Sequence, residues 1–410
     1  MHLHTVVVGG GTAGLAVSYN LAKLGIEHTV LEKGDIGESW KNHRWDSFSL
    51  NTTNQSSVLP GDENTLPDPD AFMSRDEFVE YLQSYVTRND LPVQTGVHVS
   101  KVRKNSNDIY EIETSNGAMT ADNIVVASGS QNIPKLPKLS SKIPGSILQL
   151  HSDQYKRSDA LPEGATLVIG SGQSGVQIVE DLLDAGRKVY LATSKVGRVV
   201  RRYRGRDMVN WAKDNGFYEH TIQDLEDPRM AYGAQPQTSG TKGGHTVSLQ
   251  SIEKLGAVLL GRLNGYENGK LTFADNLSEN IIFADTVSAK LTGMVEGYII
   301  KAGIDAVPAE VDEADIPYVD AESVKAPAEL DPAEVNITSI IWCTGFGGDF
   351  SWIEGVELDE RGIPVHEKGT SPNKGLYYIG FQWISKRKSG LIDGVTEDAE
   401  NITQQVKGTE

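Results

Sequence analysis

The sequence predicts an α/β protein in which one dinucleotide-binding domain is inserted into another. Two stretches support this prediction, residues 5–14 (TVVVGGGTAG) and residues 166–175 (TLVIGSGQSG). In each, a short apolar run leads directly into glycines at G-x-G-x-x-G spacing, and a helical pattern of apolar residues follows. Further strand and helix patterns after the second motif are expected to close the first domain, so its sequence is split around the second.

The first motif has the features of a nucleotide-binding turn. Gly9 lets the chain turn sharply, Gly11 lets the backbone approach a pyrophosphate, and Gly14 lets the helix pack on the strand. The phosphates then lie at the positive end of the helix dipole. Eighteen residues after Gly14, an apolar run ends in Glu32, where a carboxylate can accept hydrogen bonds from both hydroxyls of an adenosine ribose. We therefore expect an adenine dinucleotide bound by Gly9, Gly11, Thr12, Ala13, Gly14, Glu32 and Lys33.

The region after this motif contains a long polar loop and several further elements. Residues 33–61 are too long for a simple connection, which indicates a functional loop. Ser74 and Glu77 form a capping box for a scaffolding helix, and the alternating pattern of residues 97–126 predicts a small hairpin sheet. The apolar run 123–127 ends in Ser128 and Gly129, as expected for a strand that returns to the first nucleotide.

The second motif differs from the first at the position that contacts the ribose. Where the first motif has Glu32, the second has Thr193, followed by Ser194, Lys195 and several arginines. A carboxylate would repel a 2′-phosphate, whereas hydroxyl, ammonium and guanidinium groups would hold it, so we expect NADPH rather than NADH. A solvated basic face is the alternative for any single arginine. The predicted contacts are Gly170, Gly172, Gln173, Ser174, Gly175, Ser194, Lys195, Arg201, Arg202 and Arg204.

The last part of the chain has two polar stretches before its final strands. Residues 228–250 form a polar loop in which His245 is expected to cap a turn, and residues 305–334 read as a solvated excursion. Residues 337–346 (ITSIIWCTGF) predict a buried strand, and SGLIDGV is expected to open the final helix after one more strand. The helix dipole would then face an electron-rich ring, with a structural helix start as the alternative. The cofactor contacts expected here are Thr344, Gly345, Gly380, Gly390, Leu391 and Ile392.

Composition and charge exclude several classes of function. The sequence has 56 acidic and 38 basic residues, and its net charge of −18 argues against nucleic acid or an anionic membrane as a partner. No apolar run is long enough to span a bilayer, and no signal peptide precedes the first strand, so we expect a cytoplasmic protein. The single cysteine, Cys343, excludes an internal disulfide and a C-x-x-C pair. No metal site is expected, and a homo-oligomer is left open.

These motifs resemble those of two-dinucleotide-domain flavoproteins, especially the class B flavin-dependent monooxygenases and their bacterial flavin-containing-monooxygenase-like members. The resemblance is carried by GGGTAG with Glu32, GESW with RWDSFSLNT, ASG, GSGQSG with its basic follower, WCTGF, and IGFQW through SGLIDGV. It implies FAD in the first site, with Trp40 of the GESW loop among its contacts, and NADPH in the second. The implied domains are an FAD-binding domain over residues 1–160 and 336–410 and an NADPH-binding domain over residues 161–335.

The resemblance also implies a catalytic asparagine near the reactive edge of the flavin. The N-T-x-x loop of the family places this residue at Asn51, with Asn54 as a rival because two registers of the loop are open. One feature departs from the family. Its fingerprint has three residues between a glycine and a histidine, whereas here five residues separate Gly145 from His151. We expect His151 to be a structural residue.

The activity implied by the resemblance is that of an NADPH-dependent FAD monooxygenase. NADPH would reduce FAD, O2 would form a C4a-hydroperoxyflavin, and one oxygen atom would enter a small organic substrate, with N- or S-oxygenation favoured. Baeyer–Villiger oxygenation of a ketone and an NADPH-dependent flavin reductase or oxidase are the closer alternatives. A disulfide reductase needs a dithiol that Cys343 alone cannot make. A nucleotide-sensing binding protein is the alternative outside catalysis.

Overall fold

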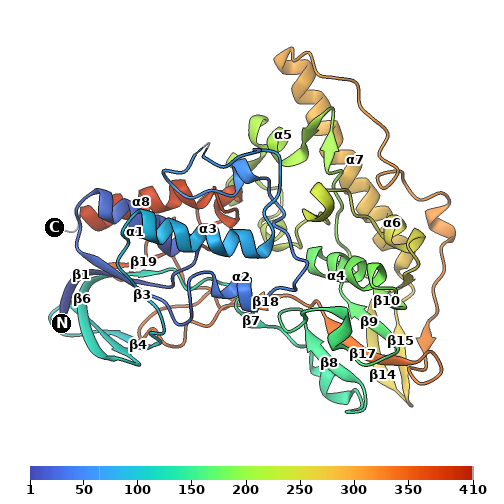
Figure 1. Cartoon of the computed structure of the whole chain (residues 1–410), viewed down its shortest axis with the longest axis horizontal. Helices are drawn as coiled ribbons and strands as arrows, with labels where there is room; N and C mark the ends of the chain where they lie inside the picture. Colours follow the sequence, from blue (N-terminus) through green and yellow to red (C-terminus); the bar gives the residue numbers. More distant parts are fainter. Residues whose placement is uncertain (64, 409–410) are drawn as a thin grey trace.

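The structure, a computed structural model, describes residues 1–63 and 65–408 and has two lobes, each formed around its own β-sheet (Figure 1). We call the lobe formed by residues 1–127 and 376–407 the first lobe, and the lobe formed by residues 148–342 the second lobe. The first and the last described segments, β1 and α8, therefore both lie in the first lobe, at the left of Figure 1. The predicted α/β fold, with one dinucleotide-binding domain inserted into another, is confirmed.

The first lobe is built on a seven-stranded sheet with the order β3-β2-β1-β6-β5-β4, in which β19 also pairs with β6. β1 runs parallel to both β2 and β6, so the carboxyl ends of these strands meet at one edge. β4, β5 and β6 form an antiparallel meander, which confirms the predicted hairpin sheet. The strands are β1 (His2–Val8), β2 (His28–Leu31), β3 (Val93–Gln94), β4 (Val99–Lys104), β5 (Tyr110–Thr114), β6 (Gly117–Val126) and β19 (Leu376–Tyr378).

Four helices of the first lobe frame this sheet. α1 (Thr12–Lys23) begins at the first glycine motif and packs against the final helix, α8 (Val395–Lys407). α3 (Arg75–Arg88) begins with the predicted capping box, in which the Glu77 carboxylate accepts a hydrogen bond from Ser74 N at 2.8 Å. α3 buries one apolar face and lies next to the short helix α2 (Glu38–Asn42).

The second lobe is built on a five-stranded parallel sheet with the order β13-β10-β9-β17-β8. Its strands are β8 (Leu148–His151), β9 (Ala165–Ile169), β10 (Val189–Ala192), β13 (Val258–Leu260) and β17 (Ile337–Trp342). Its helices are α4 (Gln173–Asp184), α5 (Met208–Asp214), α6 (Leu249–Lys254) and α7 (Leu277–Ala302). Shorter strands are β11 (Arg202–Tyr203), β12 (Arg206–Asp207), β14 (Leu263–Glu267), β15 (Lys270–Phe273) and β16 (Glu329–Leu330).

Two strands join a different sheet from the one expected. β17 pairs with β9 and β8 in the second lobe, whereas residues 337–346 were expected to return to the first domain. β8 likewise lies before the expected boundary at residue 161 and still belongs to the second sheet. The reason is physical: β17 is almost entirely buried and shows no alternation of polar and apolar residues, so its sequence does not indicate which sheet it enters. The chain passes between the lobes near β7 (Ile133–Pro134) and β18 (Phe346–Gly347), which pair antiparallel.

His151 is a structural residue at this passage. It ends β8, is 1% exposed, and its ring nitrogens lie 2.9 Å from Asp153 Oδ1 and 3.1 Å from Gly345 O. The ring also packs edge-on against Phe346, with centroids 4.7 Å apart. These contacts tie the end of β8 to the segment that leaves β17, as expected for a structural histidine.

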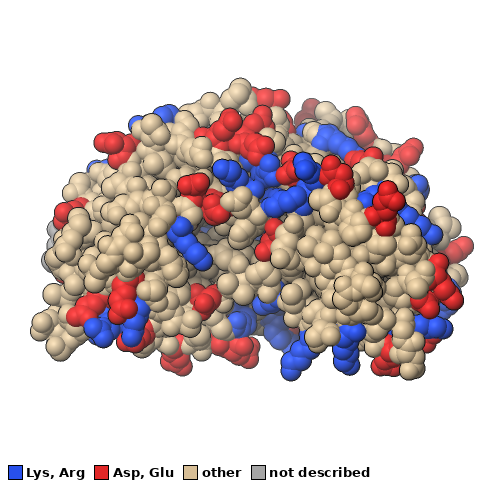
Figure 2. Space-filling view, turned by 60° about the horizontal axis from the view of Figure 1, so that its bottom comes forward, with Lys and Arg blue, Asp and Glu red and all other residues tan. Residues whose placement is uncertain are grey.

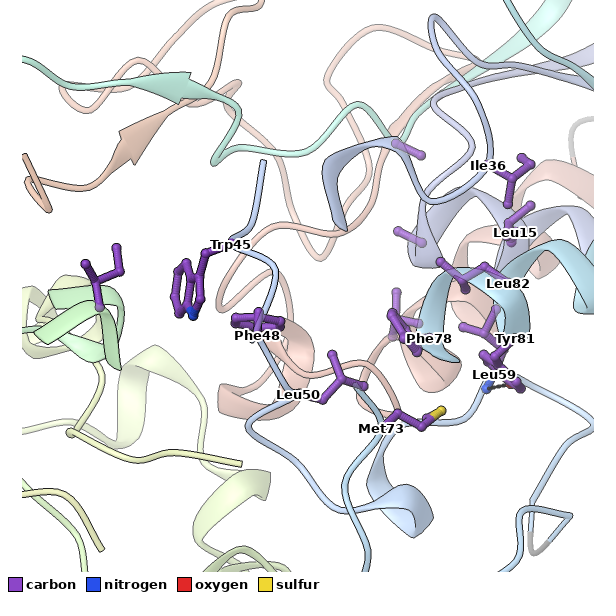
Figure 3. Packing of buried hydrophobic residues seen from close by; sticks show 14 of the residues in the cluster. Leu15, Ile36, Trp45, Phe48, Leu50, Leu59, Met73, Phe78, Tyr81 and Leu82 are labelled. Atoms are coloured by element: carbon purple, nitrogen blue, oxygen red, sulfur yellow. Dashed lines mark hydrogen bonds between the residues drawn. The ribbon is translucent and has the colours of Figure 1, made fainter. Parts of the chain in front are cut away.

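The two lobes share one hydrophobic core (Figure 3). Trp45 is 2% exposed and packs edge-on against Phe48, with ring centroids 5.1 Å apart. Figure 3 shows Trp45 at the end of the cluster that faces α4, whereas Phe78 and Tyr81 lie deeper in the first lobe. The Tyr81 hydroxyl accepts a hydrogen bond from Leu59 N at 2.7 Å. The polar loop after Glu32 is therefore anchored by aromatic residues against both lobes.

The surface carries charges of both signs. Figure 2 shows acidic and basic residues interspersed on one face, with lysine and arginine side chains gathered near the middle, between the two lobes. The net charge of −18 is therefore not a uniformly acidic surface on this face. Across residues 1–63 and 65–408, none of the helices combines the length and apolar character that a bilayer crossing requires.

Candidate functional site

The first glycine turn can be built only from glycine at two positions. Gly9 has φ 111°, and a Cβ there would lie 2.4 Å from Ala127 O, at the end of β6. A Cβ at Gly14 would lie 1.9 Å from Gly9 O. Both positions therefore bring backbone segments into direct contact, which joins β1, β6 and α1 at the edge of the sheet.

Gly11 differs from its neighbours because space is open beside it. A Cβ at Gly11 would meet no atom within 4 Å, and its φ of −79° is accessible to any residue. Gly11 is the N-cap of α1, and no side chain of the described residues caps this helix. The first-turn N–H groups and the helix dipole therefore face an open space, which fits a pyrophosphate group.

Glu32 and Ser128 flank this open space. The Glu32 carboxylate accepts hydrogen bonds from Gly10 N at 2.6 Å and from Gly34 N at 2.8 Å, so it lies over the glycine turn. Ser128 follows β6, and its Oγ is buried without a hydrogen-bond partner among the described residues. An unpaired buried hydroxyl is costly and is expected to gain its partner from a ligand. The turn thus brings together Gly9, Gly11, Thr12, Ala13, Gly14, Glu32, Ser128 and Gly129, with Lys33 exposed beside them.

The C-terminal segment passes the start of α1. A Cβ at Gly380 would lie 2.9 Å from Ala13 Cβ, so the chain after β19 runs against the first glycine turn. α8 begins at Val395 with Gly394 as its N-cap, later than the expected start at SGLIDGV. Gly390 is therefore the last residue of η9 (Arg387–Gly390), and Leu391 and Ile392 lie between η9 and α8, rather than in the final helix.

The second glycine turn repeats the first. Gly170 has φ 102°, and its Cβ would lie 2.5 Å from Cys343 O, while a Cβ at Gly175 would lie 1.8 Å from Gly170 O. Gly172 is open in the same way as Gly11 and is the N-cap of α4, which no side chain of the described residues caps. Gln173 and Ser174 form the first turn of this helix. Thr344 and Gly345 follow β17 beside this second turn, so the expectation that they close the first domain is corrected.

Ser194 and Lys195 lie at the end of β10, next to the second turn. Ser194 N donates to Ser171 Oγ at 2.9 Å, and Ser171 Oγ donates to Ser194 O at 3.2 Å. Lys195 is exposed, and its Nζ lies 5.0 Å from the centre of the Phe283 ring. No carboxylate of the described residues forms an ion pair with Lys195. These two residues therefore combine a hydroxyl and an available cation where a 2′-phosphate is expected.

The arginines that follow are already engaged by other groups. Arg201 is 3% exposed and forms a 2.7 Å ion pair with the fully buried Asp207. Arg204 pairs with Glu296 at 2.6 Å, and the exposed Arg202 donates to Gly243 O at 3.3 Å. Arg201 and Arg204 are therefore held by carboxylates rather than free for a phosphate, whereas Arg202 forms no ion pair among the described residues and stays a predicted contact. Asp207 lies in β12, the hairpin partner of β11, and Glu296 lies on α7. The positions of these carboxylates in the sequence do not show that they meet the arginines.

The two asparagine rivals occupy different surroundings. Asn54 is buried, and its Nδ2 donates to Pro67 O at 3.2 Å and to Asp68 O at 3.0 Å, which makes it a structural residue of its own loop. Asn51 instead lies at the junction of the lobes, where its Nδ2 donates to Gln173 Oε1 at 3.0 Å. Trp40 lies further along the first lobe and packs edge-on against Phe78, with centroids 5.0 Å apart.

Several residues of the junction were not predicted from the sequence. Lys213 on α5 donates to Ser56 Oγ at 2.5 Å and forms an ion pair with Asp393. The Arg387 guanidinium lies between two rings, 4.0 Å from the centre of Phe217 and 4.6 Å from that of Trp383. The contacts of Lys213 with Ser56 and Asp393, and that of Arg387 with Phe217, join the second lobe to the first. The partners are far apart in the sequence and belong to no motif, so the sequence carries no signal for them.

Trp383 shows that this junction contains backbone strain. Its φ is 58°, a left-handed conformation that is costly for a bulky residue and that persists only where surrounding contacts impose it. Its side chain is 5% exposed and stacks on Arg387.

Burial at the same junction raises the pKa of the Tyr218 hydroxyl to about 12.

His245 and Glu180 give the second lobe a pH-dependent contact. His245 Nε2 lies 2.7 Å from Glu180 Oε1, and this hydrogen bond raises the pKa of His245. A raised folded-state pKa stabilises the fold fully below the unfolded value of about 6.5, and the effect is lost as the pH rises through the folded-state value. We expect His245→Gln to cost about 1 kcal/mol of unfolding free energy at low pH and progressively less above neutrality. Urea unfolding of both proteins across this range measures the difference, and a difference that does not change with pH would contradict it.

The sequence of this chain is similar to those of known oxidoreductases. Residues 6–213 match the family described as pyridine nucleotide-disulphide oxidoreductase. An oxidoreductase of Bacillus velezensis, described as uncharacterized and named CzcO, is 32% identical over 413 residues, which cover 98% of this chain and 99% of that protein. The chain belongs to the pyridine nucleotide-disulphide oxidoreductase family.

Solved structures agree with the fold of this oxidoreductase. A flavin-containing monooxygenase from Stenotrophomonas maltophilia superposes with a TM-score of 0.65 at 18% identity, covering 100% of this chain and 99% of that one. A structure described as OTEMO in complex with FAD and NADP superposes with a TM-score of 0.57 at 17% identity, covering 99% and 86%. The family and the Bacillus relative confirm that the chain is an oxidoreductase, and the solved structures confirm the fold with two dinucleotide-binding domains.

Proposed function

We propose that this oxidoreductase is an NADPH-dependent FAD monooxygenase that inserts one oxygen atom into a small organic substrate. The observation that carries the proposal is that the chain has two open glycine turns, each at a helix start that no side chain of the described residues caps, and that Asn51 of the first lobe donates to Gln173 beside the second turn. This arrangement would bring two dinucleotides together beside an asparagine carboxamide. The Stenotrophomonas structure is described as a flavin-containing monooxygenase and the OTEMO structure as a complex with FAD and NADP, which supports the same reaction and the same two cofactors.

FAD fits the first site. Gly11 leaves room for the pyrophosphate, Glu32 would bind the ribose hydroxyls, and Ser128 Oγ would gain the partner it lacks. Gly380 and the turn at residues 390–392 lie on the side from which the C-terminal segment would contact the ring system. When bound, FAD would supply the redox chemistry, because it can accept a hydride from the nicotinamide and can then react with O2. The chain would align both nucleotides and keep water out of the junction.

NADPH fits the second site through Gly172, Ser194 and Lys195. Because Lys195 has no ion-pair partner among the described residues, its ammonium group is free for a 2′-phosphate. We expect Lys195→Glu to lower kcat/KM for NADPH about 50-fold relative to NADH, since repulsion replaces attraction. Lys188→Glu makes the same charge reversal at the opposite end of β10 and serves as the control, with the preference unchanged. Steady-state kinetics with both nucleotides measure the effect, and an unaltered preference in Lys195→Glu would place the phosphate elsewhere.

A thiol-based reductase is disfavoured by the environment of Cys343. It is the only cysteine of the chain, and burial raises its pKa to about 12, so its thiolate is strongly disfavoured. Its backbone carbonyl is packed under the second glycine turn, not the first. The reaction we favour is oxygenation of a soft nucleophile, either an amine or a sulfide. Oxygenation of a ketone and release of hydrogen peroxide are the competing outcomes. We expect the enzyme to be cytoplasmic.

The test is to supply FAD-loaded enzyme with NADPH, isotopically labelled O2 and a panel of amines, sulfides and ketones. Label in an N-oxide or S-oxide product is the expected result, and label in an ester would instead indicate a ketone oxygenase. Release of all reducing equivalents as hydrogen peroxide with every substrate would overturn the monooxygenase assignment. If the protein consumed no NADPH with any substrate, the assignment as an NADPH-dependent enzyme would be wrong.

A further inference from the structure

The hydrogen bonds that the described residues make to the Asn51 side chain all come from the second lobe, although Asn51 belongs to the first. Asn51 Nδ2 donates to Gln173 Oε1 at 3.0 Å, and Asn51 Oδ1 accepts from Gln177 Nε2 at 2.8 Å. Its main-chain carbonyl accepts from Arg201 Nη1 at 2.8 Å. Because the amide nitrogen and oxygen have different partners, the contacts distinguish the two ways in which the carboxamide could point.

The groups that hold Asn51 are themselves fixed in place. Gln177 is 4% exposed, and its Nε2 also donates to Thr238 O at 2.7 Å. Gln173 Nε2 donates to Pro236 O at 3.0 Å, and Arg201 Nη1 donates to Thr238 Oγ1 at 2.9 Å. Each partner is thus anchored a second time to the segment 236–238. None of them can rotate away from Asn51 without losing that second hydrogen bond.

We propose that Gln177 is a positioning residue that sets the orientation of the Asn51 carboxamide toward the flavin site. The inference rests on the proposed function, because only there does the orientation of Asn51 affect a reaction. With Oδ1 held by Gln177 and one hydrogen of Nδ2 given to Gln173, the second Nδ2 hydrogen has no partner among the described residues. It is the donor that the carboxamide can offer to a ligand.

The position of Gln173 connects this orientation to the nucleotide site of the second lobe. Gln173 is the first residue of α4 and follows Gly172, the open N-cap where a pyrophosphate fits. Gln177 lies one helical turn further along the same helix. The helix that would bind NADPH therefore also holds Asn51, so a dinucleotide seated at Gly172 would bind next to the groups that orient the carboxamide.

Two substitutions of Gln177 test the proposal. Gln177→Glu keeps the shape but removes both N–H donors, and Gln177→Met keeps the length and removes all hydrogen bonding. In each, we expect the share of NADPH released as hydrogen peroxide to rise about five-fold or more, because a misdirected Asn51 supports oxygenation less well. Anaerobic reduction of the bound flavin by NADPH should change less than about two-fold, since it does not use the carboxamide.

Gln250→Met is the matched control. Gln250 is also a buried glutamine of the second lobe, and its Nε2 donates to Asp285 Oδ1 at 2.9 Å and to Ile316 O at 3.1 Å, away from Asn51. This variant should lose stability to a similar extent while its peroxide share stays at the wild-type value. An equal rise in peroxide in Gln250→Met would show that the Gln177 effect reflects general loosening and would overturn the positioning role.

A double-mutant cycle gives a readout that does not depend on turnover. Asn51→Ala, Gln177→Met and the double variant are compared by urea unfolding, without NADPH or substrate. We expect the combined effect on the unfolding equilibrium constant to fall short of the product of the single effects by about five-fold, the size of one hydrogen bond. Effects that simply multiply would show that the two side chains do not interact and would contradict the proposal.

The outcomes separate the two proposals. If the wild-type enzyme oxygenates none of its substrates, the proposed function fails, while the unfolding cycle still decides whether Gln177 holds Asn51. If the wild type oxygenates a substrate and both Gln177 variants keep its peroxide share, the positioning role is wrong and the proposed function stands.

Discussion

Alanine at Gly11 is expected to weaken FAD binding severely without destabilising the FAD-free protein. A methyl group there meets no protein atom within 4 Å and requires no unusual φ, so the fold accepts it. The same methyl group enters the space that the pyrophosphate needs against the start of α1. We expect the dissociation constant for FAD to rise about 100-fold, or about 2.7 kcal/mol, while the melting temperature of the FAD-free protein stays unchanged or rises slightly.

Gly14→Ala is the contrasting variant three residues away. Its Cβ would lie 1.9 Å from Gly9 O, so the helix must move off the strand, and we expect a loss of about 3 kcal/mol or more in unfolding free energy. Flavin fluorescence titration measures FAD binding, and thermal unfolding measures stability. If Gly11→Ala binds FAD as tightly as the wild type, the pyrophosphate does not lie at this turn.

Arg201→Met is expected to be strongly destabilising and to leave the preference for NADPH over NADH unchanged. The substitution leaves Asp207, which is 0% exposed, without its cation, and breaking a buried pair costs about 3–5 kcal/mol. For a folding unit of the size of the second lobe, this loss is expected to lower the melting temperature by about 10 °C. The nucleotide preference should not change, because the Arg201 guanidinium contacts Asp207, Thr238 and Asn51 rather than open space.

Two further variants make this expectation specific. Arg204→Gln breaks the more exposed pair with Glu296 and should cost less than about 1 kcal/mol. Adding Asp207→Leu to Arg201→Met removes the stranded carboxylate and should restore part of the lost melting temperature. If Arg201→Met has normal stability but a smaller preference for NADPH over NADH, the prediction is wrong and Arg201 binds the 2′-phosphate.

Much of the fold followed from local patterns. The glycine motifs, the capping box before α3 and the alternating hairpins after residue 97 were all predicted, because each depends on neighbours within a few positions of the chain. The sheet to which β17 belongs was not predicted correctly. β17 is buried on both faces along almost its whole length, so no solvent-facing side indicates its neighbours, and only its pairing with β9 and β8 shows to which sheet it belongs.

The candidate site divides in the same way. The glycine spacing and Glu32 are requirements of a nucleotide and its backbone contacts, so the sequence indicated them. The arginines were a weaker inference, since charge alone does not say whether a cation meets a ligand or a carboxylate. Asp207 and Glu296 take up Arg201 and Arg204, and Lys195 is left available. The surroundings of Asn51 and Asn54 were likewise not indicated by the sequence, because Asn51 bonds to Gln173 of the second lobe and Asn54 to the backbone of its own loop.

The sequence by itself determined that this chain has two strand-turn-helix units that can each hold a dinucleotide, because the close approach of backbones at Gly9, Gly14, Gly170 and Gly175 requires glycine at a fixed spacing. Only the tertiary structure decided how the units meet. It assigned β17 to the second lobe, buried Arg201 against Asp207, and oriented Asn51 through Gln173 and Gln177. The contacts of Asn51 join residues more than a hundred positions apart, and they form only when both lobes are packed together. The pairing of β17 and the burial of Arg201 arise from the packing of the second lobe.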